Sequence, residues 1–304
     1  MGETLKRPPR PFEKRRAGRP LPGRDFKRRG AGGPPIPRQE FRKPRTPKPM
    51  PPRPAPEGAD RLRNLKLTLE YDGSRYRGWQ IQTRERTVAG ILTEVLGELL
   101  RERVNVIGAG RTDAGVHAEA QVANFRTHTP MPAASLLETI NRELPHDINL
   151  LRIEDVPLDF HARHNAGWRR YRYQIALRRS AFLKPYTWWL KDSPDQAMMR
   201  IAASYLVGRH NYGSFAARGR PVDEPLVEVY EASLKEDFPL LNFRIAADHF
   251  LPKMVRKIVG VLVRVGRHDF PPEKIKEFLE GKQPVPEDSV APPSGLFLEK
   301  VEYP

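Results

Sequence analysis

The chain has 304 residues, 32 prolines, no cysteine and a formal net charge of +16. Without cysteine it can form no disulfide, no thiolate metal site and no thiol nucleophile. No apolar run approaches the roughly 20 residues that a bilayer-spanning helix needs, so we expect a cytoplasmic protein that does not enter a membrane.

Residues 1–60 differ in composition from the rest of the chain. They contain 17 Lys and Arg against 6 Asp and Glu, which is +11 of the +16, and 15 of the 32 prolines. A segment so poor in large apolar side chains cannot offset its ordering entropy by burial. We therefore expect a disordered basic extension that can bind polyanions. A mitochondrial transit peptide is the competing interpretation, but the Pro and Gly density and the missing amphipathic period disfavour it.

Residues 61–165 show clear apolar periods. The alternation over residues 65–71 predicts a half-buried strand, and Thr87 can cap a helix over residues 88–100. The further expected elements are strands over residues 104–107 and 121–126, a helix beginning at Pro132, and a strand over residues 148–153. The resulting order, β-α-β-β-α-β, is that of a ferredoxin-like domain.

Residues 166–304 repeat this order more loosely. The expected elements are strands over residues 171–177, 226–234, 241–246 and 296–301, and helices over residues 197–207, 250–265 and 273–279. The chain is thus predicted to be α+β, with two ferredoxin-like (RRM-like) halves in an antiparallel or mixed sheet. Two such halves would leave a central cleft, a common place for a ligand.

The stretch Gly-Ala-Gly-Arg-Thr-Asp-Ala-Gly-Val-His, residues 108–117, places Asp113 in a glycine-rich bend. Taken alone, it is typical of a structural turn. A phosphate-binding loop is disfavoured, because neither the Gly-x-Gly-x-x-Gly nor the Walker spacing is present and no helix period follows. A carboxylate at the tip of a constrained loop would nevertheless face the cleft.

A second charged residue needs a partner. Arg256 falls on the apolar side of the expected helix over residues 250–265. An unpaired buried arginine costs several kcal/mol, on the order of 3–5. One alternative is that Arg256 extends to a surface acid. The other pairs its guanidinium with Asp113 across the cleft.

Five ordered motifs carry a resemblance to a known family. They are Tyr-Asp-Gly-Ser-Arg-Tyr-Arg-Gly-Trp-Gln at residues 71–80, Gly-Arg-Thr-Asp-Ala-Gly-Val-His-Ala at 110–118, Arg-Tyr-Arg-Tyr at 170–173, Met-Val-Arg at 254–256, and Ala-Pro-Pro-Ser-Gly-Leu at 291–296. In this order they resemble the tRNA pseudouridine synthase A family, from Leu65 to Pro304, with the basic extension outside. Lys257 and the pair Pro252-Lys253 depart from the family pattern.

The resemblance implies a pseudouridine synthase fold and the isomerisation of uridine to pseudouridine at positions 38, 39 and 40 of the tRNA anticodon stem-loop. It also implies a homodimer that needs no cofactor and no metal ion. The matched motif makes Asp113 the nucleophile, either by attack at C1′ or by proton abstraction to give a glycal; an older scheme has it add to C6 of the base. Arg256 would keep this carboxylate ionised.

The same resemblance assigns the surrounding residues. Tyr171 would lie against the uracil, and its hydroxyl could help remove the C5 proton. Leu296 would form an apolar wall. Arg111 is placed either to take the space that the flipped base leaves or to hold the flipped nucleotide through its phosphate. Independently of the resemblance, phosphate contacts are expected from arginines that the sequence places near the cleft, with Arg170 and Arg172 as substrate-binding residues; the full set is Arg75, Arg77, Arg84, Arg86, Arg169, Arg170, Arg172 and Arg178. His117 is expected to stabilise the loop and not to carry a proton.

Two other functions compete with this one. A non-catalytic RNA-binding protein or RNA chaperone could keep the fold and the basic extension without turnover, but it would have no chemical need for Arg111, Asp113, Tyr171 and Arg256 together. A metal-dependent nuclease is disfavoured, because the sequence shows no clustered carboxylates for two ions.

Overall fold

A computed structural model of the chain describes residues 61–217 and 224–304. The basic extension predicted over residues 1–60 lies outside the described residues. Within these described ranges, no helix is both long enough and apolar enough to cross a bilayer.

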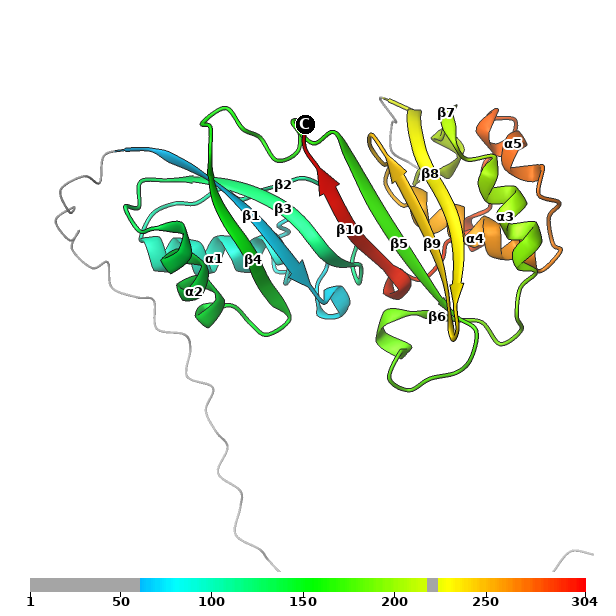
Figure 1. Ribbon diagram of the computed structural model, residues 1–304, viewed down its shortest axis with the longest axis horizontal. Coiled ribbons are helices and arrows are strands. Elements are labelled where there is room, and N and C mark those ends of the chain that lie inside the picture. The colour runs from blue at the N-terminus through cyan, green and yellow to red at the C-terminus, as the bar shows by residue number, and fades with distance from the viewer. Residues whose placement is uncertain (1–60, 218–223) are drawn as a thin grey trace, which may run out of the picture. The chain divides into compact units, whose positions relative to one another are not determined.

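The first half has the expected order of elements (Figure 1). They are β1 (Arg63–Tyr71), α1 (Val88–Leu100), β2 (Ile107–Gly108), β3 (His117–Thr127), α2 (Ala133–Glu143) and β4 (Ile148–Val156). Strand β1 lies between β4 and β3, both antiparallel to it, and β2 pairs with the other edge of β3. This is the strand order of a ferredoxin-like unit.

The second half repeats that arrangement with two additional short strands. Its elements are β5 (Trp168–Ala176), β6 (Trp188–Trp189), α3 (Gln196–Ser204), β7 (Gly208–Asn211), β8 (Leu226–Asp237), β9 (Leu240–Ala247), α4 (Met254–Gly266), α5 (Lys274–Leu279) and β10 (Leu296–Glu302). The strand order β10-β5-β9-β8 matches that of the first half, and β7 extends it at the edge.

The last strand of the chain joins the two halves. Strand β10 runs parallel to β3, with Phe297 opposite His117, and antiparallel to β5, with Leu298 opposite Tyr171. The halves therefore share one ten-stranded mixed sheet. A ligand site between them must lie on a face of this sheet and not in a gap between two sheets. The boundary expected between residues 165 and 166 stays a prediction.

The two faces of the sheet differ in chemistry. One face, here called the helix face, carries the apolar side chains that α1, α2 and α4 cover, among them Leu65, Leu67 and Leu69 of β1 and Tyr171 of β5. The other face, here called the polar face, carries Arg170, Arg172, Arg244 and Glu299. Neighbouring residues of a strand point to opposite faces, so the Arg-Tyr-Arg-Tyr motif of β5 is divided between them.

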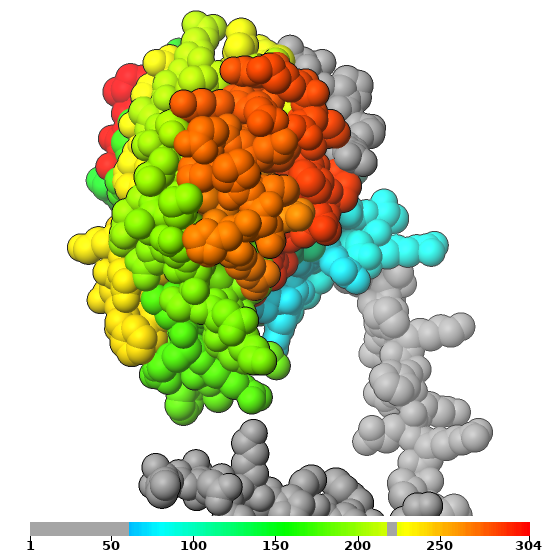
Figure 2. All heavy atoms as spheres, turned by 90° about the vertical axis from the view of Figure 1, so that its right-hand side faces the viewer, coloured from blue at the N-terminus to red at the C-terminus, as the bar shows by residue number. Residues whose placement is uncertain are grey.

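Local chemistry explains the helix boundaries. The Thr87 hydroxyl accepts a hydrogen bond from the Gly90 backbone N–H at 3.2 Å, so α1 begins where the sequence predicted. Helix α4 is buried almost throughout, and a Cβ at Gly260 would lie 1.6 Å from the Ser289 carbonyl oxygen. Only glycine allows this approach. Figure 2 shows the end of the second half that α5, in orange, and α3, in yellow-green, cover together.

Some strand expectations need correction. The strand expected over residues 104–107 is reduced to Ile107–Gly108, although Val104 and Val106 are buried. Val104 and Val106 alternate with polar residues as in a strand because both are buried, but the backbone there does not pair with a neighbouring strand. Strand β3 begins at His117, four residues before the expected start, because the bend that holds Asp113 leads directly into the sheet.

Candidate active site

The loop that carries Asp113 connects β2 to β3 and is held by the turn that follows β1. The Gly115 N–H donates to the Tyr76 carbonyl oxygen at 3.2 Å, and the Trp79 N–H donates to the Thr112 carbonyl oxygen at 3.1 Å. Gly78 has a φ of +95°, and a Cβ there would lie 2.6 Å from the Thr112 oxygen. The first motif of the sequence thus serves as the support of the second.

Buried polar groups fix the loop from beneath. The hydroxyls of Tyr71 and Thr112 are 2.8 Å apart, and the Gln121 side chain donates to the Gly110 carbonyl oxygen at 2.9 Å. Burial raises the pKa of Tyr71, so its hydroxyl stays protonated. These contacts leave Asp113 at the tip of a loop whose backbone is fixed on both sides.

The ion pair expected between Asp113 and Arg256 is present. The Arg256 Nη1 atom lies 3.0 Å from the Asp113 Oδ2 atom, and the Arg256 Nε–H donates to the Ala291 carbonyl oxygen at 2.8 Å. Arg256 comes from α4 in the second half, so the pair joins the two halves on the helix face. The Arg256 side chain is 15% exposed and that of Asp113 is 37% exposed. A second molecule can therefore still reach the carboxylate.

Tyr171 lies beside this pair. Its ring meets Phe250 edge to face at a centroid distance of 4.9 Å, and its hydroxyl oxygen is 3.7 Å from where a Cβ on Gly110 would be. Burial, with a smaller contribution from the charge of Asp113, raises the pKa of Tyr171 to about 12, while Arg169 opposes the shift. The phenol is thus protonated at neutral pH, and it makes no hydrogen bond within the described part of the chain.

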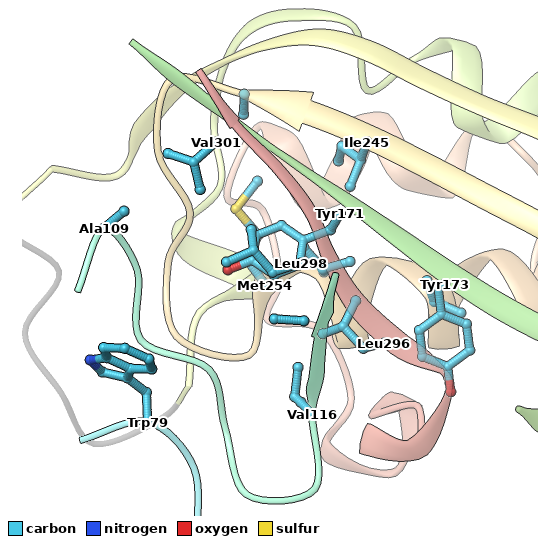
Figure 3. Close-up of a cluster of buried hydrophobic side chains, with 14 of the residues drawn as sticks. Trp79, Ala109, Val116, Tyr171, Tyr173, Ile245, Met254, Leu296, Leu298 and Val301 are labelled. Carbon is cyan, nitrogen blue, oxygen red and sulfur yellow. The ribbon is translucent and has the colours of Figure 1, made fainter. Parts of the chain in front are cut away.

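Apolar side chains surround the tyrosine. Leu296 is 5% exposed and lies opposite Tyr173 in the β10–β5 pair, next to Leu298 opposite Tyr171. Figure 3 shows these side chains in one cluster with Val116 from the Asp113 loop. Leu296 therefore lies where an apolar wall was expected, although its burial also suits a plain core residue.

Arg111, unlike Arg256, has no partner among the residues that the structure describes. Its side chain is exposed, and its guanidinium makes no hydrogen bond or ion pair with residues 61–217 or 224–304. It lies two residues before Asp113, on the solvent side of the same loop. This leaves its five N–H donors free for a ligand.

Arg170 and Arg172 are not brought to Asp113. They lie on the polar face, where Arg170 Nε is 2.9 Å from Glu299 Oε2 and Arg172 also pairs with Glu119. Both residues are neighbours of Tyr171 in β5, so their side chains point to the other face of the sheet. Their role as substrate contacts stays a prediction, and the structure places them away from the ion pair.

Arg169 was expected among the cations near the cleft that contact phosphates, but it is bound to backbone carbonyl oxygens and supports the Asp113 loop. Its guanidinium donates to the Ala109 and Arg163 carbonyl oxygens at 3.1 and 2.7 Å, and to the Asp248 carbonyl oxygen at 2.7 Å. Burial lowers its pKa. It shares the face of Tyr171, two residues away, and the period of two could have identified it. Gln121 is buried with no such signal in the sequence.

His117 holds the loop, as the sequence suggested. Its Nδ1 atom accepts the Gly73 N–H at 3.1 Å, and its ring stacks on Phe297 at 4.7 Å between centroids. Burial lowers the pKa of His117, so the ring is neutral in the fold. Among the described residues no group of three or more His, Asp or Glu side chains is arranged to hold a metal ion.

Comparison with known proteins gives a consistent family. The family model described as tRNA pseudouridine synthase matches residues 68–165 and 202–304, which include Asp113, Arg256 and Leu296. The tRNA pseudouridine synthase A of Clostridium acetobutylicum is 39% identical over 244 residues, 80% of this chain and 100% of the relative. That of Moorella thermoacetica is 42% identical over 243 residues, 79% of this chain and 99% of the relative. That of Thermoanaerobacter sp. is 38% identical over 244 residues, with coverages of 80% and 100%. The chain belongs to the tRNA pseudouridine synthase family.

Proposed function

We propose that the chain converts uridine to pseudouridine in tRNA, at positions 38, 39 and 40 of the anticodon stem-loop. The single observation that carries the proposal is the ion pair of Asp113 with Arg256, 3.0 Å long, formed across the two halves beside Tyr171. A carboxylate that is paired and still 37% exposed can act on a bound nucleoside.

The reaction rearranges bonds within one nucleotide. The bond between N1 of uracil and C1′ of ribose breaks, the base turns, and C5 forms the new bond to C1′. The C5 proton leaves, and N1 gains one. There is no net oxidation, so no redox cofactor takes part in this scheme.

Asp113 is the nucleophile in this proposal. It either attacks C1′ or removes the 2′ proton of the sugar to give a glycal, and addition to C6 of the base is a third route. Each route uses the Asp113 carboxylate, which the Arg256 guanidinium holds in an ion pair of 3.0 Å. The second bond of Arg256, to the Ala291 carbonyl oxygen, fixes the direction from which the charge acts.

Tyr171 and Arg111 act on the extruded base. The target nucleotide must leave its stack, which costs about a few kcal/mol. The Tyr171 ring offers a surface for the uracil, and its raised pKa favours hydrogen-bond donation over removal of the C5 proton. Arg111, with free donors next to Asp113, would bind the phosphate or occupy the vacated stack.

We also propose, from the resemblance, that the protein is a cytoplasmic homodimer. The basic extension is proposed to bind RNA. Deletion of residues 1–60 removes +11 of the charge. We expect weaker tRNA binding and a shallower salt dependence, with an unchanged rate at saturating tRNA. Binding titrations at 50 and 200 mM salt measure this. Loss of the circular dichroism signal of the folded protein would instead assign the extension a structural role.

The experiment that tests the proposed function uses the full chain and an unmodified tRNA transcript. After incubation, pseudouridines are mapped by carbodiimide labelling and primer extension. The proposal predicts new stops that report positions 38, 39 or 40. Binding of tRNA without any pseudouridine would favour the RNA chaperone instead, and modification elsewhere would contradict the assigned positions.

A further inference from the structure

The segment after β5, residues 178–191, exposes an unusual set of side chains. Its sequence is Arg-Arg-Ser-Ala-Phe-Leu-Lys-Pro-Tyr-Thr-Trp-Trp-Leu-Lys, with four cations and no acid. Phe182 is 91% exposed, Trp189 45% and Tyr186 37%. Three exposed aromatic rings in one short segment are unusual for a solvent-exposed loop, and exposed apolar surface of this kind marks interaction sites. We call residues 178–191 the aromatic-basic loop; it lies in the gap between the two ranges that the family model matches.

The cations of the aromatic-basic loop form no ion pair among the described residues, although Arg178 donates a long hydrogen bond to the Arg179 carbonyl oxygen at 3.4 Å. Arg178, Arg179, Lys184 and Lys191 are all exposed. The Arg179 guanidinium carbon lies 6.0 Å from the centre of the Trp189 ring. Charge and aromatic surface therefore coincide.

The base of the loop is rigid. The Gln174 side chain donates to the Tyr186 carbonyl oxygen at 2.9 Å, and the Ser294 hydroxyl donates to the Thr187 carbonyl oxygen at 3.2 Å. The Thr187 hydroxyl closes the loop on the Leu183 carbonyl oxygen at 2.8 Å. The exposed rings are thus presented by a fixed backbone, which lowers the entropy lost on binding.

The loop lies at the same end of the sheet as Asp113. Strand β10 runs parallel to β3 and antiparallel to β5, so the residues after β5 and those before β3 meet at one end. The Tyr186 hydroxyl donates to Asp72 Oδ2 at 3.0 Å, and its ring meets the edge of His117, four residues after Asp113. Figure 1 shows the loop projecting beyond the sheet at this end.

We propose that the aromatic-basic loop is a second RNA-contact surface, which binds unpaired bases and phosphates of the tRNA next to the nucleotide being modified. This rests on the proposed function. Aromatic rings interleaved with cations suit single-stranded RNA, because bases stack on the rings while phosphates pair with the charges. A second copy of the chain fits less well, since a two-fold contact would bring four cations of each copy together.

The test measures tRNA affinity of the full chain without turnover, by titration on ice with the unmodified transcript. Phe182→Ala and Trp189→Ala are each expected to weaken binding about tenfold. The double variant Arg178→Gln, Arg179→Gln is expected to reduce the slope of log affinity against log salt by about 1.4. Tyr230→Ala, 52% exposed, and Arg209→Gln are matched controls at the opposite end of the sheet, and both should bind as the wild type does.

Two results would overturn the proposal. One is unchanged tRNA affinity in the three loop variants. The other is a change in the molar mass of the loop variants, measured by analytical ultracentrifugation, together with an unchanged tRNA affinity. That result would show that the loop forms a contact between copies of the chain. A wild type that binds tRNA through this loop but forms no pseudouridine would support the RNA surface and contradict the proposed function, so the two claims fail separately.

Discussion

On the helix face, Arg256 meets Asp113 and leaves 37% of that side chain exposed; on the polar face, Glu299 is 14% exposed and lies among Arg170, Arg172 and Arg244. Both sites are arginine–carboxylate contacts, and both join segments far apart in the sequence. They differ in how much of the carboxylate remains accessible. A carboxylate enclosed by three arginines holds strands together, whereas one with a single arginine and open access can meet a substrate.

Arg256→Lys should disrupt the ion pair with Asp113 on the helix face. We expect it to lower the reaction rate more than a lysine substitution at any other arginine of the two faces. An ammonium cannot bind Asp113 and the Ala291 carbonyl oxygen in the same fork geometry, so we expect the single-turnover rate to fall about a hundredfold. The tRNA affinity should change less than threefold, or roughly 0.6 kcal/mol. Arg244→Lys on the polar face is the control, and equal losses in both variants would remove the distinction between the two faces.

Glu299→Gln should act on stability and not on the rate. It leaves three guanidiniums beside a neutral amide, and we expect the free energy of unfolding to fall by about 2 kcal/mol. Urea unfolding followed by circular dichroism measures the loss, and single-turnover assays at saturating tRNA should be unchanged. If Glu299→Gln has the stability of the wild type but reacts much more slowly, the polar face takes part in the reaction.

The smallest effect concerns pH. Burial lowers the pKa of His117, so the ring is neutral in the fold, whereas in the unfolded chain it protonates near pH 6.5. Below that pH the unfolded state binds more protons, and the free energy of unfolding falls until the lower pKa of the folded state is passed. His117→Gln should flatten this dependence between pH 7.5 and 5.5. Parallel curves for the two proteins in urea titrations would contradict it.

Local signals predicted much of the fold. The cap at Thr87 and the apolar period that ends at Leu100 predicted the observed bounds of α1, although Leu96, which the predicted apolar face left out, is among its buried residues. The positions of β6 and β7 were not predicted, because strands of two and four residues carry too little period to be distinguished from a loop. The central place of β10 depends on pairing between residues far apart, such as Leu298 with Tyr171, which no local pattern encodes.

The sequence motifs identified those residues of the candidate site that the structure brings together. Asp113, Arg256, Tyr171 and Leu296 meet on the helix face. Arg170 and Arg172 were grouped with Tyr171 because they adjoin it in sequence, although the strand period sends them to the other face. The supports of the loop, such as Gln121, act through buried hydrogen bonds that a single sequence does not display.

The most direct test of the account compares Asp113→Asn with the wild type on unmodified tRNA, measuring the single-turnover rate of pseudouridine formation and the tRNA affinity on the same preparations. The amide keeps the shape of the side chain and removes its charge and nucleophilicity. We expect the rate to fall by at least about 10⁴-fold, with tRNA affinity within about threefold of the wild type. A variant that still forms pseudouridine at a rate near that of the wild type would show that the carboxylate beside Arg256 is not the group that carries the reaction.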